Sequence, residues 1–320
     1  MTSSAMSDLR VTLGCAARDA LCSAIHSARA SVIAEFHVLG DRHVIASLNA
    51  AAARGVHVEV CVEGDVDRYD HPHKSPVSSD SCAEKTAERL RKELSSAVHL
   101  VVETDADVLM HAKAAVVDGD TAFIATANPS WSGLSSPGEV LVEDRAAADV
   151  QAIVHSFQRD KAGETEPQTS SAFGQVVAGP SPAVRANVER LLESEHDIRL
   201  ASEDLSDPDI VERLKMRRLD GHHDRVLVDT FAKHMSPTET QALNCLRLSG
   251  VLLRSPAAVP MHEKYLDDGD AIYVGSANLT RNGLEESREI GIVAPSTSFG
   301  EGAAALRADF DRTWALATPY

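Results

Sequence analysis

Apolar residues along the first half of the chain form short continuous runs separated by stretches with helical spacing. The runs are rich in Val and Ile, which is typical of buried strands: Ser31–Phe36, Val56–Val62 and Val98–Glu103. The intervening stretches predict helices: Leu13–Ala28, Val44–Ala53 and Cys82–Leu94. Strands that alternate with helices indicate largely parallel sheet covered by helices, and therefore an α/β fold.

The second half of the chain repeats this order of elements. The predicted strands are Asp197–Ala201, Arg225–Val228 and Gly250–Arg254, and the predicted helices are Pro182–Ser194, Pro208–Arg217 and Thr238–Leu248. Residues 161–180 are rich in Gly, Pro, Ser, Thr and Gln and are expected to link the halves. We therefore expect two similar α/β sandwich lobes related by a pseudo-twofold axis, residues 1–160 and 181–320, each with a mixed, mostly parallel sheet.

The repeat also holds residue by residue. Leu39, Asp41 and Val44 recur as Leu205, Asp207 and Ile210, 166 positions later. A second set recurs 151 or 150 positions later, and these pairs carry side chains with chemistry: His111 and His262, Lys113 and Lys264, Asp118 and Asp268, Asn128 and Asn278, Glu139 and Glu289. The change in spacing indicates loops of different length in the two halves.

Each His-x-Lys segment is expected to open a β-hairpin. HAKAAVV and TAFIATA read as two strands, and Asp118-Gly119 between them is a strong turn signal. The second half repeats this pattern around Asp268-Gly269. Residues two apart on a strand face the same way, so His111 and Lys113 should project together. The turn should return Asn128 to the same end.

An imidazole, an ammonium and an amide at one sheet end suit phosphoryl transfer. Lysine and amide donors stabilise the charge on phosphate oxygens, a neutral histidine can attack phosphorus, and a protonated one can donate to a leaving oxygen. One half supplies one imidazole, and two facing halves supply both. This chemistry requires no metal and no cofactor, and we expect none.

The motif resembles the HKD signature of the phospholipase D superfamily, HxKx4Dx6GSxN. The first copy keeps the spacing but has Ala125-Thr126-Ala127-Asn128 in place of GSxN. The second copy has GSAN intact, but only three residues separate Lys264 from Asp268. Asp267 and Asp270 remain alternatives to Asp268.

The resemblance implies a metal-independent phosphodiesterase with a phosphohistidine intermediate. Its implied catalytic set is His111, Lys113, Asp118, Glu139, His262, Lys264, Asp268 and Glu289, with Asn128, Thr126, Asn278 and Ser276 on the substrate phosphate. His111 is taken as the nucleophile and His262 as the proton donor, although the reverse stays open. Glu139 and Glu289 should orient the histidines. For Asp118 and Asp268 we favour a turn and packing role, because Asp is common in turns.

Composition restricts the setting of this chemistry. The 320 residues carry a net charge of −17, so binding to nucleic acid or an anionic membrane needs a local basic patch. The clearest basic cluster, Arg213–Arg218, reads as the exposed face of a helix. The five cysteines are odd in number and form no CxxC pair, which indicates reduced thiols and a cytoplasmic protein. A signal peptide and a membrane span are not expected.

The substrate stays open among three readings. A phospholipid hydrolase or transferase similar to the cardiolipin synthases is favoured, a nuclease is the second reading, and a catalytically silent scaffold is the third. Peripheral membrane contact stays open, and a monomer is expected because the duplication completes the site. Asp70-His71-Pro72-His73 is interpreted as a solvated loop and Gly221–Asp224 as a turn. Trp131 is assigned to either the site entrance or the core, and Phe310 and Trp314 to core packing.

Overall fold

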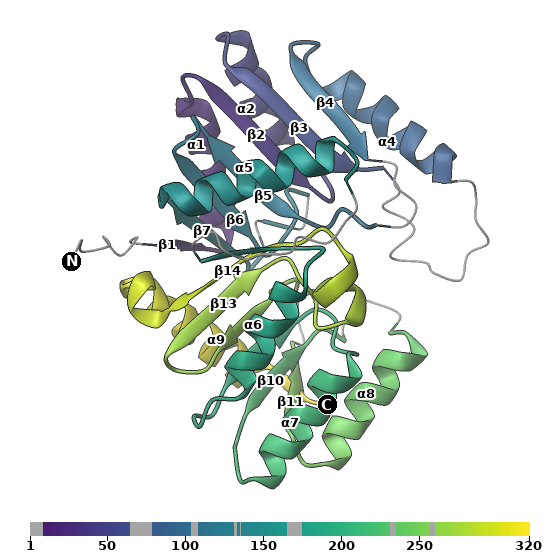
Figure 1. Cartoon of the computed structure of the whole chain (residues 1–320), viewed down its shortest axis with the longest axis vertical. Helices are drawn as coiled ribbons and strands as arrows, with labels where there is room; N and C mark the ends of the chain where they lie inside the picture. Colours follow the sequence, from purple (N-terminus) through teal and green to yellow (C-terminus); the bar gives the residue numbers. More distant parts are fainter. Residues whose placement is uncertain are drawn as a thin grey trace.

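Two lobes, each built on one β-sheet with helical cover, are stacked on one another (Figure 1). The computed structural model describes residues 9–64, 79–103, 108–130, 133–134, 136–164, 175–230, 235–256 and 260–320, with only the backbone for 79–84. Asp70–His73 and Trp131 lie outside the described residues. The expectation of two similar α/β lobes is confirmed.

The N-terminal lobe has a seven-stranded sheet in the order β1-β7-β6-β5-β2-β3-β4. Its strands are β1 (Arg10–Leu13), β2 (Ser31–Phe36), β3 (His57–Glu63), β4 (Val98–Glu103), β5 (Lys113–Val117), β6 (Thr121–Ala125) and β7 (Val140–Asp144). Its helices are α1 (Cys15–Ser27), α2 (Arg42–Ala53), α4 (Ser79–Glu93) and α5 (Ala147–Lys161).

The C-terminal lobe has an eight-stranded sheet in the order β15-β11-β10-β9-β12-β13-β14-β8. Its strands are β8 (Val176–Ala178), β9 (Arg199–Ser202), β10 (Arg225–Val228), β11 (Leu252–Ser255), β12 (Tyr265–Asp267), β13 (Ala271–Gly275), β14 (Ile290–Pro295) and β15 (Thr318–Pro319). Its α-helices are α6 (Pro182–Leu192), α7 (Pro208–Leu219), α8 (Pro237–Leu248) and α9 (Glu301–Leu316), with a short π-helix at Asn282–Glu286 and a short 3-10 helix at Ser296–Phe299.

Two details differ from the sequence expectation. Parallel pairing is confined to β2-β3-β4 and β9-β10-β11, and the other strand pairs are antiparallel, so the sheets are mixed but not mostly parallel. The antiparallel part comes from the hairpins, whose strands return directly without a crossover helix. In addition, β8 lies within the stretch expected to be a linker. It pairs with β14 at the edge of the second sheet.

Matching caps explain part of the repeat. The carboxylate of Asp41 accepts hydrogen bonds from the backbone N–H groups of His43 and Val44 at the start of α2. Asp207, 166 positions later, accepts from Asp209 and Ile210 at the start of α7. An N-terminal cap of this kind stabilises a helix by about 1 kcal/mol. Each lobe therefore starts the helix after its first central strand in the same way.

The hairpins form as the turn signals predict, and they bring the lobes together. Asp118 and Gly119 both have positive φ angles, 53° and 71°, as a tight turn between β5 and β6 requires. Strand β6 packs against β13 and β14 of the other lobe. One buried apolar cluster accordingly contains residues of both sheets, including Ile124 and Val142 from one lobe and Val274 and Ile292 from the other. The lobes share this core.

Helix α9 also packs as expected. Phe310 is fully buried, and its ring stacks on that of Trp314 with centroids 6.2 Å apart. Arg225 and Arg254 place their guanidinium groups over the Trp314 ring. Such cation–π contacts add modestly to the packing of the helix against the sheet.

Candidate active site

Both His-x-Lys segments lie at the junction of the lobes. Lys113 is the first residue of β5, and Lys264 directly precedes β12. The residue before each histidine is held by an acidic side chain at the end of a central strand. The N–H group of Met110 donates to Glu63 (2.9 Å), and that of Met261 donates to Asp229 (3.1 Å). Glu63 and Asp229 are 166 positions apart and occupy matching places in the repeat. The duplicated framework therefore presents both histidines from equivalent positions.

Glu139 and Glu289, which match each other in the repeat, make contacts across the junction. Glu289 of the C-terminal lobe lies 2.9 Å from Nδ1 of His111, and Glu139 of the N-terminal lobe lies 3.5 Å from Nδ1 of His262. Glu139 also accepts the backbone N–H of His262 at 2.9 Å. Both carboxylates are buried. Each glutamate thus contacts the histidine of the opposite half, through a hydrogen bond for His111 and an ion-pair contact for His262.

The hydroxyl groups before each Asn hold these glutamates. Thr126 donates to Glu139 at 2.7 Å, and Ser276 donates to Glu289. Both side chains are fully buried. The sequence predicts contacts of Thr126 and Ser276 with the substrate phosphate, whereas here each hydroxyl hydrogen is directed at a carboxylate. They act on the histidines indirectly.

The two lysines are folded back onto the histidine backbone. Lys113 Nζ donates to the His111 carbonyl, and Lys264 Nζ donates to the His262 carbonyl, both at 2.7 Å. Lys264 Nζ also lies 2.5 Å from Glu203. Both lysine side chains are almost fully buried. Each ammonium is therefore held close to its imidazole.

The two asparagines fix the loops that follow β2 and β9. Asn128 Oδ1 accepts from the Val38 N–H at 3.1 Å, and Asn278 Oδ1 accepts from the Asp204 N–H at 3.4 Å. Among the described residues, the buried Nδ2 of Asn278 has no hydrogen-bond partner. A buried amide donor without a partner is costly, so a site ligand that accepts from it would be stabilised.

The electrostatic environments of the two histidines differ. Burial lowers the pKa of His111, and the neighbouring Lys113 lowers it further, against the opposing effect of Glu289. Burial also lowers the pKa of His262, but Glu139 and Glu203 outweigh it, so this pKa is raised. Burial and the charge of Lys264 lower the pKa of Lys113 to about 7. One imidazole is therefore biased toward the neutral form and the other toward the charged form.

Comparison with known proteins agrees with the two-lobe arrangement. A family described as "Cardiolipin synthase, PLD-like domain" matches residues 21–161 and 188–314. The chain belongs to this family. The two matched segments correspond to the two lobes, and each contains one His-x-Lys segment. No curated protein matches the chain significantly.

Solved structures share the PLD-like fold at low sequence identity. Phosphatidylserine synthase from Haemophilus influenzae Rd KW20 has a TM-score of 0.69 and 9% identity, covering 98% of this chain and 87% of that one. Polyphosphate kinase from Porphyromonas gingivalis has a TM-score of 0.57 and 17% identity, covering 87% of this chain. The match spans only 42% of the kinase. These similarities establish the fold.

The aspartates of the PLD-like motif lie away from the histidines. Asp118 is at the far end of β5 from Lys113, where its carboxylate accepts from the N–H groups of Arg29, Ala30 and Ser31. Asp268 accepts from the N–H groups of Asp270 and Ala271 in the second hairpin turn. The alternative acid Asp267 is buried against Arg307. Their contacts are those of turn and packing residues.

Sequence reasoning missed three residues at this PLD-like site. His37 lies beside His111, with ring centroids 5.0 Å apart, and Glu203 contacts Lys264. Arg288 crosses from the C-terminal lobe to Glu103 (2.8 Å) and Asp160 (3.1 Å), and its carbonyl accepts the His111 N–H. The repeat could have pointed to His37 and Glu203, because these two residues are also 166 positions apart.

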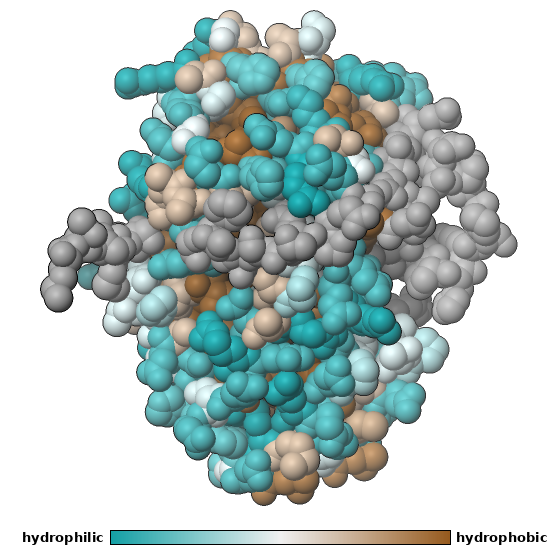
Figure 2. Space-filling view, viewed as in Figure 1, coloured by the Kyte–Doolittle hydropathy of each residue, from teal (hydrophilic) through white to brown (hydrophobic). Residues whose placement is uncertain are grey.

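The basic cluster on α7 does not form a free positive surface. Arg213 pairs with Glu189 and Glu193, and Lys215 pairs with Glu212. Arg217 is buried, contrary to the expected exposed face, and binds Asp224 through two nitrogens. Hydrophilic side chains cover most of the C-terminal lobe on the face in Figure 2. Arg213, Lys215 and Arg217 of this helix are therefore engaged in ion pairs.

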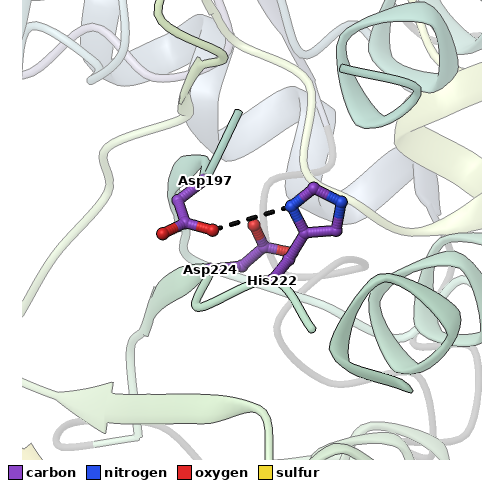
Figure 3. A group of neighbouring side chains, drawn as sticks. All are labelled: Asp197, His222 and Asp224. Atoms are coloured by element: carbon purple, nitrogen blue, oxygen red, sulfur yellow. Dashed lines mark ion pairs between the residues drawn. The ribbon is translucent and has the colours of Figure 1, made fainter. Parts of the chain in front are cut away.

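Asp197, His222 and Asp224 are close enough to suggest a metal site (Figure 3). However, the Asp224 carboxylate is already occupied by the guanidinium of Arg217 at 2.7 and 2.8 Å. Asp197 accepts the N–H of His223 at 2.8 Å. A cation there would face the Arg217 charge, so these groups stabilise the turn before β10, as expected from the sequence.

Proposed function

We propose that this chain is a phosphodiesterase that hydrolyses or transfers a phosphodiester through a phosphohistidine on His111. The observation that carries the proposal is the crossed pairing of His111 with Glu289 and of His262 with Glu139. A carboxylate at Nδ1 leaves Nε2 as the reacting nitrogen and stabilises the imidazolium when it forms. Two such imidazoles, one from each lobe, supply a nucleophile and a proton donor.

In the first step, Nε2 of His111 attacks phosphorus and the bond from phosphorus to the leaving oxygen breaks. His262 gives its Nε2 proton to that oxygen, so the alcohol departs neutral. In the second step, His262 takes a proton from water or from a second alcohol, whose oxygen attacks phosphorus. The phosphorus–nitrogen bond to His111 then breaks, and both histidines return to their starting states.

The cationic and amide groups of the site are suited to the phosphate oxygens. Lys113 and Lys264 are held beside the histidines by the carbonyl groups of His111 and His262. The buried Nδ2 of Asn278 adds a neutral donor. Donors fixed before the reaction stabilise the charge that grows on the non-bridging oxygens.

For the substrate we favour a phospholipid. The net charge is −17, and the Arg213–Arg218 cluster is neutralised by neighbouring acids, so it offers little attraction for a polynucleotide backbone. The family description and the phosphatidylserine synthase fold are in line with lipid chemistry. Among the described residues, no helix is long and apolar enough to cross a membrane.

A substrate panel tests this function. Purified protein is offered bis(p-nitrophenyl) phosphate, phosphatidylcholine vesicles, and single- and double-stranded DNA at low salt. Cleavage of the first two in the presence of a strong chelator is expected. Preferential cleavage of DNA would replace the lipid assignment with a nuclease. Full activity in His111→Ala or His262→Ala, or loss of activity on chelation, would overturn the mechanism.

Trapping the intermediate tests the assignment of the nucleophile. A His262→Asn variant given bis(p-nitrophenyl) phosphate should release one p-nitrophenolate and keep the p-nitrophenyl phosphoryl group on His111, because p-nitrophenolate leaves without protonation and the second step lacks its base. Mass spectrometry should locate the modification. A p-nitrophenyl phosphoryl group on His262 in His111→Asn, and none on His111 in His262→Asn, would reverse the roles.

A further inference from the structure

The two halves differ at one position beside the histidines. His37 directly follows β2, and Glu203 directly follows β9, 166 positions later. His37 Nδ1 lies 3.0 Å from the Met110 carbonyl, and its ring meets that of His111 edge to face. Glu203 instead lies 3.8 Å from Nε2 of His262 and 2.5 Å from Nζ of Lys264. The same place in the repeat holds an imidazole in one half and a carboxylate in the other.

These two side chains carry different charges. Burial, His111 and Lys113 together hold the pKa of His37 well below its usual range, so the ring is neutral near pH 7. Burial would raise the pKa of Glu203, but the charges of Lys264 and His262 lower it overall, so the carboxylate is ionised. The pseudo-twofold symmetry of the site is therefore broken by about one negative charge, placed next to His262.

The charged groups that face His262 come from several elements. Glu139, before β7, acts at Nδ1, and Glu203, after β9, acts at Nε2. Lys264 lies on the same segment and opposes them. Across the junction, Lys113 and His111 both interact with the Glu203 carboxylate. Because Glu203 pairs with Lys264, it both adds a negative charge near His262 and offsets the nearest positive one.

We propose that Glu203 is a positioning residue that keeps the His262 imidazole protonated at the shared site. With His37 in the matching place of the first half, it decides that His262 donates the proton and His111 attacks. The inference rests on the two-histidine mechanism proposed above. Glu203 itself stays ionised through both steps and exchanges no proton with the substrate.

The primary test is an NMR titration of ring-labelled histidines, which needs no substrate. In Glu203→Gln the His262 pKa should fall by about one unit, because an opposite charge within about 4 Å shifts a pKa by that order. Glu203→Asp keeps the negative charge, so its His262 pKa should stay close to that of the wild type. The matched control is Glu212→Gln, an exposed glutamate paired with Lys215 on α7, which should leave His262 unchanged. An unchanged His262 pKa in folded Glu203→Gln overturns the proposal.

Kinetics supply a readout that a purely structural role would not move. An alcohol leaving group needs protonation, whereas p-nitrophenolate needs little. In Glu203→Gln, kcat for short-chain phosphatidylcholine should fall about tenfold more than kcat for bis(p-nitrophenyl) phosphate, with KM for both little changed, since one pKa unit corresponds to a factor of 10. Equal losses with both substrates would contradict the role of Glu203 in proton donation.

The two proposals can fail separately. If wild-type protein cleaves none of the diesters, the proposed function fails and the proton-donor role fails with it. A lowered His262 pKa in Glu203→Gln would still support control of its protonation by Glu203. If the wild type is active but the His262 pKa does not respond, only the inference about Glu203 fails.

Discussion

Glu289 of the C-terminal lobe lies 2.9 Å from Nδ1 of His111 in the N-terminal lobe, and the backbone of the preceding Arg288 accepts the His111 N–H at 2.9 Å. The first histidine is therefore held in place by the second half of the chain. Glu139 makes the reciprocal contact with His262 at a longer distance of 3.5 Å. The duplication thus supplies the second imidazole and also the partner that orients each one.

This crossed pairing predicts that Glu289→Gln is nearly inactive although folded. The amide can present its NH2 group to Nδ1 and favour the wrong tautomer of His111, so kcat should fall by about 10²- to 10⁴-fold. Steady-state kinetics with bis(p-nitrophenyl) phosphate measures the loss. Ser276→Ala, which removes only the hydroxyl that donates to Glu289, is the control and should lose far less. Near-normal kcat in Glu289→Gln would show that His111 does not depend on this carboxylate.

Lys113 predicts a pH dependence of phosphate binding. Its pKa of about 7 lies below the usual range of lysine, so the ammonium form predominates below pH 7 and is lost as the pH rises through 7. The affinity for dimethyl phosphate, a monoanion throughout, should therefore weaken between pH 6 and pH 8. Isothermal titration calorimetry measures the dissociation constant across this range. In Lys113→Met, binding should be weaker and should lose the part of the pH dependence centred near 7; an unchanged profile would remove Lys113 from phosphate binding.

Arg288 predicts a large stability effect at the lobe junction. Its side chain is fully buried between Glu103 and Asp160, so Arg288→Met leaves buried acids without their cation. Breaking a buried ion pair in this way costs about 3–5 kcal/mol of unfolding free energy. The cost should be smaller at pH 5 than at pH 8, because protonation neutralises the stranded carboxyls at low pH. Urea unfolding at both pH values measures it.

The matched control for this change is Arg281→Met, because the Arg281 side chain is 75% exposed and pairs with Glu285 and Glu286, whose side chains are 36% and 54% exposed. Surface pairs contribute about 0–1 kcal/mol. Equal losses in the two variants would mean that the Arg288 pairs do not stabilise the junction.

Asp118 is expected to stabilise the fold and to take no part in the chemistry. Its carboxylate accepts from three consecutive backbone N–H groups, Arg29 to Ser31, and these bonds lower its pKa despite partial desolvation. Asp118→Ala should lose about 1–2 kcal/mol of stability, comparable to loss of a helix cap, and should retain most of its kcat at 20 °C. Thermal unfolding and kinetics of the same preparation provide both values. A folded Asp118→Ala protein with kcat reduced like that of His111→Ala would place Asp118 in the chemistry after all.

The sequence determined the lobe plan, the hairpins and the identity of the paired motifs. These features are local or repetitive: the β5-β6 hairpin follows from Asp118-Gly119, and the caps of α2 and α7 follow from Asp41 and Asp207. Hydrophobic period and turn chemistry act over a few residues, so the order of residues alone specifies them. The repeat extended this local information to both halves.

Only the tertiary structure decided which side chains meet. In the sequence, Glu139 and Glu289 each follow the motif of their own half. In the structure, β6 packs against β13 and β14, and each glutamate contacts the histidine of the opposite half. The same packing buries Arg288 and sets Glu203 against His262. Contacts between residues more than a hundred positions apart depend on how two sheets dock, and the sequence period of each sheet carries no information about that docking.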